Sequence, residues 1–407
     1  MSEHQHGFMQ RKSTITNLIN LVQDVSSELD IGGQMDAVFT DFEKAFDSVD
    51  HDILLTKLNK LGFSQKALIF FSSYLSGRTQ YVHYLGNSSK EYRVKSGVPQ
   101  GSNLGPVMFL IASNDLPDCI KHSKCLSYAD DFKICRPISS IQDCYLLQSD
   151  LNNISQWSNE NKINFNVKKC AIMSFTRKKN PTSFPYKLGL YPLQQVSEVN
   201  DLGVLIDKGL TFTSHINKVT NEAYRALGFV IRNVKPFKEE KTVITLYNAY
   251  VRAKLEYTSV VWTPWCNKYI RLIEGVQKRI ARFLHYKMSG TYPFMVPYKL
   301  LIQNLNITSL EDRRKINDAK FLYKIVNSVV DNSYFLSLIN FHVPRPSART
   351  CTIFKNKKPC TTSHKHSPLY RLCRNHNKAV QCNNNLDFDN SFRKFTSIYA
   401  TTLTMQS

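Results

Sequence analysis

The sequence lacks two features that would place it at a membrane or in the secretory pathway. No uninterrupted apolar run approaches the roughly 18 to 20 residues that a membrane-spanning helix needs, so we expect no membrane partner. The first 16 residues are polar, so we also expect no secretory signal. The ten cysteines form no dense framework, which favours reduced thiols in an intracellular protein of the cytosol or nucleus.

The carboxyl-terminal region also lacks a tight Cys-x-x-Cys pair, the usual mark of a structural zinc site. Its cysteines and histidines are instead scattered: Cys351, Cys360, His364, His366, Cys373, His376 and Cys382. We therefore assign no zinc ion to them.

Acidic residues are few for the number of basic ones. The chain has 32 Asp and Glu against 53 Lys and Arg, a formal net charge of +21, which favours a polyanionic partner. Residues 217–300 hold 15 Lys or Arg and 5 Asp or Glu, a local excess of 10. Aromatic residues are interleaved there: Tyr224, Phe229, Phe237, Tyr247, Tyr250, Tyr257, Trp262 and Trp265. We expect most of these aromatics to form a helical core and the charges to face nucleic acid.

Against this shortage of acids, two aspartates stand side by side in Tyr128-Ala129-Asp130-Asp131. The short apolar stretches on either side predict two strands joined by a tight turn that carries the acids. Adjacent carboxylates at the end of a buried hairpin repel each other and lose solvation, and a divalent cation offsets that cost. A solvated Asp-Asp turn is the alternative for the tetrapeptide alone.

A third carboxylate, Asp41, lies at the end of a predicted buried strand over residues 36–42. The apolar pattern that follows predicts a helix over residues 53–61. Asp47 and Asp50 stand just before that helix, where a cap or a favourable charge at the helix start is the preferred interpretation over a metal ligand.

The segment between these acids is rich in glycine and proline. Ser96-Gly97-Val98-Pro99-Gln100-Gly101-Ser102 predicts a shaped loop that enters a buried helix over residues 107–112. Such a loop lets the backbone approach a flat or phosphorylated ligand closely, and Gln100 offers both a donor and an acceptor. An ordinary strand-to-helix connection is the alternative for the loop alone.

Together these motifs resemble the reverse transcriptase of non-LTR retrotransposons (LINE elements) close to the jockey group. The resemblance rests on residues 39–47, 96–102 and 128–131, and continues in His6-Gly7-Phe8, Asn166 to Cys170, Asp201 to Val204 and Val276 to Arg279. It covers nearly all 407 residues. It implies an RNA-directed DNA polymerase with an RNA template, a DNA primer or target and deoxynucleoside triphosphates as partners. It also implies the nucleus and a cytoplasmic ribonucleoprotein as locations.

The resemblance assigns roles to residues at matching positions. It implies that Asp41, Asp130 and Asp131 bind two Mg²⁺ ions, with Mn²⁺ as an alternative, and that the Phe42 carbonyl assists. Phe46 is expected to stack under the incoming sugar and reject a 2′-hydroxyl, with core packing as its alternative.

On the nucleotide side, Gln100 and Gly101 are expected to line the pocket. Lys169 matches the family's lysine behind the active site, with its neighbour Lys168 as the alternative. The segment from Asp201 to Val204 is expected to hold the primer end.

The fold implied is α+β, a right-hand polymerase with a palm sheet, partial fingers and a mainly helical thumb. We expect partial fingers and palm over residues 1–216, a basic helical thumb-like domain over 217–340, and a polar tail over 341–407 that is irregular or loosely packed.

One departure from the family leaves other interpretations open. Residue 1 falls just before His6-Gly7-Phe8, so the family's preceding fingers segment is expected to be missing. The chain would then be a polymerase with impaired nucleotide binding, or a remnant that binds nucleic acid without extending a primer. A two-metal nuclease is the third alternative, which Phe46 and the Gln100 loop disfavour because a nuclease needs no nucleotide pocket.

Overall fold

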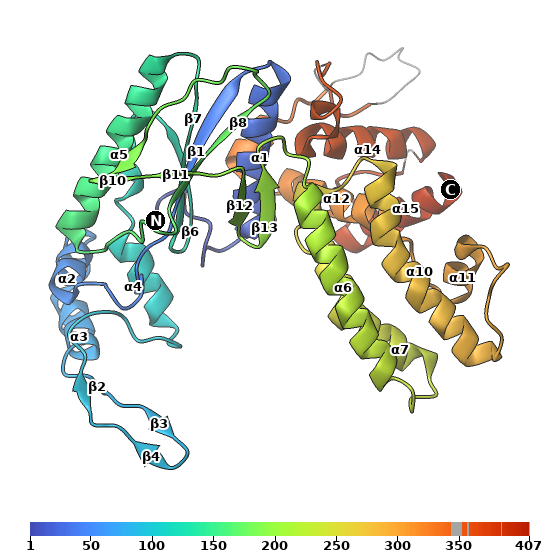
Figure 1. Ribbon diagram of the computed structural model, residues 1–407, viewed down its shortest axis with the longest axis horizontal. Coiled ribbons are helices and arrows are strands. Elements are labelled where there is room, and N and C mark those ends of the chain that lie inside the picture. Colours follow the sequence, from blue (N-terminus) through green and yellow to red (C-terminus); the bar gives the residue numbers. More distant parts are fainter. Residues whose placement is uncertain (343–351, 356–357, 384, 407) are drawn as a thin grey trace. The chain divides into compact units, whose positions relative to one another are not determined.

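The computed structural model describes residues 1–342, 352–355, 358–383 and 385–406 (Figure 1). These residues form two units: residues 1–17 with 32–197, the first unit, and residues 18–31 with 198–407, the second unit. The division at residue 197 differs from the expected boundary at 216, and the expected tail belongs to the second unit.

A five-stranded sheet organises the first unit. Its strand order is β11 (Gln194–Gln195), β8 (Ala171–Thr176), β1 (Gln34–Thr40), β7 (Asp131–Pro137) and β6 (Lys124–Tyr128). β1 pairs antiparallel with both β7 and β8, and β6 pairs antiparallel with β7. Every residue of β1 is buried, because a central strand is covered on both faces.

Helices cover this sheet and present their apolar faces to its core. They are α2 (His51–Lys60), α3 (Gln65–Leu75), α4 (Leu104–Ala112), α5 (Ile141–Asn161) and the short 3-10 helix η1 (Pro117–Cys119). Asp50 caps α2 by accepting hydrogen bonds from two backbone N–H groups, as predicted. Ser140 and Asp143 form a capping box at the start of α5, in which the Ser140 N–H donates to Asp143 Oδ2 over 3.0 Å.

A thin hairpin arm follows α3 and extends away from the sheet (Figure 1). It is built from β2 (Thr79–Gln80) paired with β5 (Tyr92–Arg93), and β3 (His83–Tyr84) paired with β4 (Asn87–Ser88). The alternating pattern of residues 81–85 and 92–95 around Gly86-Asn87 predicts a hairpin. The hairpin is confirmed, but its turn lies at Leu85-Gly86, one residue earlier. Both turn residues have positive φ, 46° and 81°, so a leucine adopts the conformation that asparagine tolerates better.

The second unit is mainly helical. It contains most of α1 (Thr14–Asp30), α6 (Thr213–Asn233), α7 (Glu240–Tyr247), η2 (Asn248–Arg252), α8 (Ala253–Glu256), α9 (Ser259–Trp262), α10 (Asn267–Ser289), α11 (Tyr298–Asn304), α12 (Leu310–Val326), α13 (Ser333–Ser337), η3 (His364–His366), α14 (Pro368–Cys382) and α15 (Phe392–Gln406). The apolar pattern of residues 199–206 predicts a strand, but this segment forms the hairpin of β12 (Glu198–Asp201) and β13 (Val204–Asp207). In the first unit, β9 (Lys187–Leu188) pairs with β10 (Tyr191–Pro192).

The expected aromatic core of the basic segment is wrong. Of the eight aromatic residues singled out, Tyr247 and Trp262 are buried. Five are exposed: Phe229, Phe237, Tyr250, Tyr257 and Trp265. Aliphatic side chains at helical spacing, such as Leu227 on α6 and Ile280 on α10, fill the core instead. The 15 basic residues of this segment are all exposed or half-buried. That these charges face nucleic acid stays a prediction.

The expected irregular tail is also wrong for the residues that the structure describes. Helices α14 and α15 bury an apolar face each, and Arg371 on α14 forms a buried ion pair with Asp318 on α12, with Nε 2.9 Å from Oδ2. The start of the tail at residues 344–347 and Cys351 lie outside the described residues.

Among the described helices, none is both long enough and apolar enough to cross a bilayer.

Candidate active site

The register of the sheet brings two of the predicted acids together. β1 pairs with β7 up to Thr40 opposite Phe132, so the next position of this ladder sets Asp41 opposite Asp131. Directly opposed residues of an antiparallel pair have Cα atoms about 5 Å apart and share one face. Asp130 lies in the turn that joins Tyr128 to Asp131. All three aspartates are half-buried, and Asp41 and Asp131 lie at the same end of the sheet.

The turn that carries Asp130 is clamped by the amino-terminal segment. Gln5 forms a parallel bridge with Ser127, and its buried side chain reaches the turn. Its Oε1 accepts hydrogen bonds from the N–H groups of Gly7 (2.7 Å) and Ala129 (2.9 Å), and its Nε2 donates to the Ala129 carbonyl (3.4 Å). Ala129 has a φ of 55°, a conformation that L-residues adopt only when their surroundings impose it.

Gly7 completes this clamp because no side chain fits at its position. A Cβ on Gly7 would lie 2.3 Å from the Ala129 nitrogen. Sequence reasoning noted His6-Gly7-Phe8 only as part of the resemblance and missed Gln5 entirely. The available signal was the glycine, since a glycine inside such a motif often marks a close backbone approach.

A buried polar network lies behind the same turn. Lys133 Nζ donates to Asn17 Oδ1 (2.5 Å), and Asn17 Nδ2 donates to the Ser127 carbonyl (3.0 Å). His6 Nδ1 lies 2.7 Å from Thr16 Oγ1, and burial, together with nearby lysines, lowers the pKa of His6 to about 3. His6 is therefore neutral at physiological pH, and Lys133 is the buried cation of this network.

The glycine-rich loop is fastened to the segment that follows Asp41. The Gly97 N–H donates to the Val49 carbonyl, the Val98 N–H donates to the Phe46 carbonyl, and a Cβ on Gly97 would lie 2.6 Å from Asp47 Cα. Gln100 is exposed, and its Nε2 donates to Asp47 Oδ1 over 2.7 Å. Asp47 therefore holds the loop, and its expected role at the start of α2 is wrong because Asp50 occupies that position.

Phe46 and Phe42 occupy different environments near this loop. Phe42 is buried and stacks on Phe165 with ring centroids 4.6 Å apart. Phe46 is only half-buried, and its ring contacts Phe109 at 4.9 Å. Core packing therefore accounts for part of the Phe46 side chain and leaves part accessible. Gly101 is exposed, with a φ of 75° and open space around its Cα.

Lys169 is the lysine that reaches the acids. Its Nζ lies 2.9 Å from Asp41 Oδ2, while its side chain remains 66% exposed. The contact with Asp41 raises the pKa of Lys169, and the charges of Asp130 and Asp131 act in the same direction. The geometry thus favours Lys169 over its neighbour Lys168, and the shared effect on one ammonium group is consistent with the three acids lying near each other.

Comparison with known proteins decides the family. A family model described as "Reverse transcriptase (RNA-dependent DNA polymerase)" matches residues 1–231. The chain belongs to the reverse transcriptase family. The predicted resemblance to non-LTR retrotransposon enzymes is confirmed by the relatives, which include the jockey element.

Three similar proteins come from Drosophila melanogaster. The "Probable RNA-directed DNA polymerase from transposon X-element" is 28% identical over 69% of this chain and 32% of its own length. The polymerase from transposon BS is 27% identical over 77% of this chain and 35% of its own length. That of the mobile element jockey is 28% identical over 54% of this chain and 25% of its own length. The chain thus spans about a third or less of the length of these three relatives.

A solved telomerase from Candida albicans, in complex with a fragment of telomeric RNA, matches at 12% identity with a TM-score of 0.35. The match covers 80% of this chain and 55% of that one. The α+β class expected from the sequence is confirmed by the fold and the family match.

The oxygen atoms of this candidate site indicate whether it suits divalent metal ions. Asp41 Oδ2 is buried, accepts no hydrogen bond from the described residues and lies 2.9 Å from the Lys169 ammonium group. A carboxylate oxygen of this kind is a suitable ligand for a hard divalent ion, which would take the place of the ammonium group. Within the described residues, no group of three or more His, Cys, Asp or Glu is arranged to hold a metal by itself. Mg²⁺ does not require one, because waters and substrate phosphates usually complete its shell.

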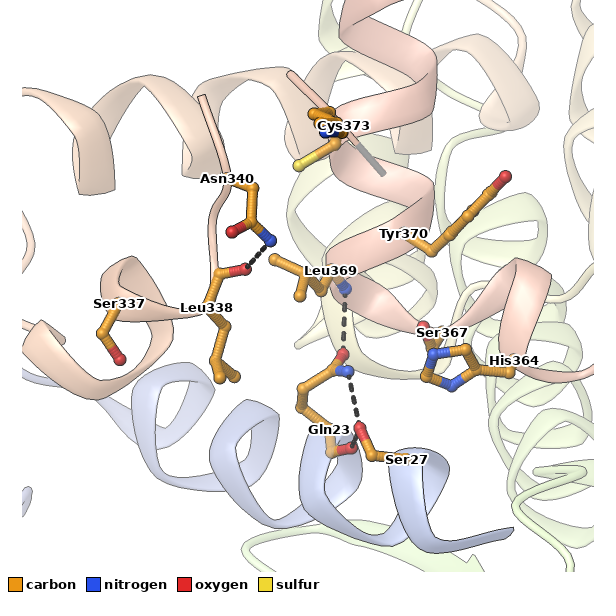
Figure 2. A pocket seen from close by; sticks show the side chains of 11 residues that line it. Gln23, Ser27, Ser337, Leu338, Asn340, His364, Ser367, Leu369, Tyr370 and Cys373 are labelled. Atoms are coloured by element: carbon orange, nitrogen blue, oxygen red, sulfur yellow. Dashed lines mark hydrogen bonds between the residues drawn. The ribbon is translucent and has the colours of Figure 1, made fainter. Parts of the chain in front are cut away.

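A cavity of about 300 Å³ in the second unit of this reverse transcriptase is a separate feature (Figure 2). In Figure 2, Gln23 Oε1 accepts from the Leu369 N–H (3.1 Å) and Gln23 Nε2 donates to Ser27 Oγ (3.3 Å). Two of the scattered carboxyl-terminal side chains, His364 and Cys373, line it, but the predicted catalytic residues do not. Its lining has no carboxylate, so this cavity does not compete with the aspartates as the active site.

Proposed function

We propose that this chain is the polymerase part of a non-LTR retrotransposon reverse transcriptase and adds deoxynucleotides to a primer 3′ end. The observation that carries this proposal is the β1–β7 register, which supports a shared site for Asp41 and Asp131 next to Asp130. Asp41 directly follows β1 and Asp131 begins β7, so two paired strands position these carboxylates before any substrate binds.

In this proposal Asp41, Asp130 and Asp131 hold two divalent ions, with help from the Phe42 carbonyl. When bound, such a pair lowers the pKa of the primer hydroxyl and neutralises charge on the leaving pyrophosphate. The clamp from Gln5 and Gly7 keeps Asp130 in place, and Lys169 neutralises part of the acidic charge at Asp41. Mg²⁺ is the expected ion because all the donors are hard oxygens.

The proposed nucleotide side of the site consists of Phe46, Gln100, Gly101 and Lys169. The half-buried ring of Phe46 has accessible area for a sugar to pack on. Gln100 is exposed, and its amide donates to Asp47 Oδ1, so the amide can reach a nucleotide once that bond is exchanged. Lys169 carries a raised pKa, so it stays protonated at physiological pH and suits contact with a triphosphate.

The proposed partners are an RNA template, a DNA primer or target and deoxynucleoside triphosphates. The net charge of +21 and the exposed cations of residues 217–300 support a polyanionic partner. The nucleus and a cytoplasmic ribonucleoprotein are the places where such partners meet.

A chain that binds nucleic acid without extending a primer is the second candidate. The observation that favours it is that Lys169 and Gln100 are each engaged by an aspartate of the same unit, so nucleotide has to displace both contacts.

A primer-extension assay separates the two candidates. The full chain is incubated with a poly(A) template, an oligo(dT) primer and dTTP, with and without Mg²⁺. We expect extension that needs template and divalent ion together. Template binding without any extension at saturating dTTP would favour the binding-only candidate, and extension without a divalent ion would contradict the proposed site.

A further inference from the structure

The hairpin arm is exposed over its whole length. Every residue from Thr79 to Arg93 is exposed, including apolar and aromatic side chains that normally seek a cover. The exposed fractions are 58% for Tyr81, 69% for Val82, 72% for Tyr84, 81% for Leu85 and 63% for Tyr92. A contiguous exposed patch of this kind marks an interaction site on a protein surface.

The arm is also poorly stabilised by itself. Its four strands are two residues long each, and a lone two-stranded hairpin is marginally stable in water. Its tip places Leu85 at a φ of 46°, a strained conformation for a leucine, with the side chain directed to solvent. A partner that covers the arm would therefore stabilise it.

The charges of the arm indicate the partner. Residues 78–95 carry Arg78, Lys90, Arg93 and Lys95 against one acid, Glu91. The large exposed rings are tyrosines, which stack on bases and keep a polar edge in water. Tyrosines are also common in protein interfaces, so the excess of cations is the feature that favours a polyanionic partner.

The base of the arm is joined to the glycine-rich loop. Arg78 donates to the Gly97 carbonyl (2.7 Å) and to the Leu75 carbonyl (3.1 Å), and the Val94 N–H donates to the Arg78 carbonyl (2.9 Å). Gly97 in turn is bonded to Val49 in the segment after Asp41. The base of the arm is thus bonded to the proposed nucleotide-binding loop.

We propose that the hairpin arm binds single-stranded nucleic acid, with Tyr81, Tyr84 and Tyr92 stacking on successive bases and Lys90, Arg93 and Lys95 contacting phosphates. The proposal rests on the proposed polymerase function, for which an unpaired template strand is the natural ligand. Binding is tolerant of sequence, because every base offers a face to stack on.

The test measures binding of the full chain to a fluorescently labelled 16-nucleotide poly(U) strand by anisotropy. The variant Y81A/Y84A/Y92A removes the rings, and Y81F/Y84F/Y92F keeps the rings and removes the hydroxyls. Tyr191→Ala is the matched control, since Tyr191 is 61% exposed in the same unit but outside the arm. Because each lost stack weakens binding by about 5- to 150-fold, we expect the triple alanine variant to bind at least ~30-fold more weakly. The phenylalanine variant and Tyr191→Ala should bind like the unmodified chain.

Charge is tested separately with K90Q/R93Q/K95Q. Each phosphate contact to a single strand contributes about 0.7 to the slope of log K against log salt, so we expect the slope to fall by roughly 2. An unchanged slope would overturn the phosphate contacts.

Two results would overturn the arm as a nucleic-acid site. One is binding of the triple alanine variant within twofold of the unmodified chain while its thermal unfolding is also unchanged. The other is unchanged poly(U) binding with a lower sedimentation coefficient, which would make the arm an interface between two copies of this chain.

Asp130→Ala distinguishes this proposal from the polymerase proposal. That variant should bind poly(U) normally and fail to extend a primer. If it extends a primer normally, the proposed active site fails, while the arm is still judged by poly(U) binding alone.

Discussion

The turn that carries Asp130 is held by a residue 124 positions away in the sequence. Gln5 satisfies the N–H and the carbonyl of Ala129 at once, and so stabilises the positive φ of that residue. Without this acceptor, the N–H groups of Ala129 and Gly7 would be left in a site where water has limited access. The precision of the acidic site therefore depends on a neutral amide that has no chemistry of its own.

Gln5→Met tests this clamp, because methionine keeps the length of the side chain and removes its polar atoms. Each buried N–H that loses its acceptor costs about 1–3 kcal/mol, so we expect the free energy of unfolding to fall by about 2 kcal/mol. Hydrogen exchange at the Ala129 amide should accelerate, and kcat for primer extension should fall more than KM changes. Gln10→Met, at an exposed position of the same segment, is the control. Unchanged exchange at Ala129 would show that Gln5 does not hold the turn.

Two glycines of the glycine-rich loop allow a direct comparison of alanine substitutions. Gly97 and Gly101 both have positive φ, 85° and 75°, but only Gly97 abuts other atoms, the Asp47 backbone. Gly101→Ala carries only the conformational cost of about 1–2 kcal/mol. Gly97→Ala adds overpacking against backbone, so we expect a total near ~3 kcal/mol or more and a raised KM for dTTP. Equal losses of stability in urea titrations would contradict the fastening of this loop to the segment after Asp41.

At the residue scale, the sequence predicted the positions of the acidic residues but not the residues that hold them in place. Asp41, Asp130 and Asp131 each stood at a predicted strand end or turn, and strand ends gather at sheet edges. Gln5 could not be predicted, because its contact depends on a parallel bridge to Ser127 that no local pattern encodes.

At the scale of elements, helix α14 has a buried apolar face within a sequence of polar composition. Leu372, Cys373, His376 and Val380 fall on one helical face and are buried, although the surrounding sequence is rich in Asn, Lys and Arg. His376 packs among Phe354, Phe388 and Phe395, and neither ring nitrogen has a hydrogen-bond partner among the described residues.

This buried histidine makes stability depend on pH. Burial lowers the pKa of His376 to about 4, below the ordinary value of 6.5. Between these values the unfolded chain binds a proton that the folded chain does not, so the free energy of unfolding falls as pH falls. In urea titrations, the free energy of unfolding of the unmodified chain should decrease between pH 7 and pH 5. We expect this decrease to be smaller by about 2 kcal/mol in His376→Phe. His215 and His366, whose pKa values are also lowered to about 4, leave a residual slope.

His122→Phe is the control for this variant, because His122 is exposed. If His376→Phe and the unmodified chain lose the same free energy of unfolding between pH 7 and pH 5, His376 is not the source of this pH dependence.

Elements with strong local patterns matched the structure, and elements that depend on tertiary packing did not. The strands around the acids and helix α2 were predicted because the apolar pattern and the acidic residues at the helix start agree there. The aromatic residues of α6 to α10 were assigned to the core on composition alone, but burial is decided by which helix face meets a neighbour. The tail was misjudged for the same reason.

At the scale of the whole molecule, the net charge and the family match are both consistent with a polyanionic partner. A net charge of +21 is unfavourable for a compact chain by itself and favourable on a polyanion. The exposed cations of residues 217–300 and of the hairpin arm lie in different units, so each can be neutralised without the other. This predicts that binding to a primer–template weakens with salt even after the arm is altered, because cations outside the arm still release counterions.

The most direct test of the central claim, that the three aspartates form a catalytic metal site, is the single-nucleotide extension rate of Asp130→Ala. The measurement uses saturating primer–template, dTTP and Mg²⁺, and compares the variant with the unmodified chain and with Asp118→Ala, an aspartate of η1 outside the site. Loss of a metal ligand should slow extension by about a thousandfold or more, while folding survives because one repelling anion is gone. Asp118→Ala should extend normally. Extension by Asp130→Ala at the unmodified rate would contradict the account.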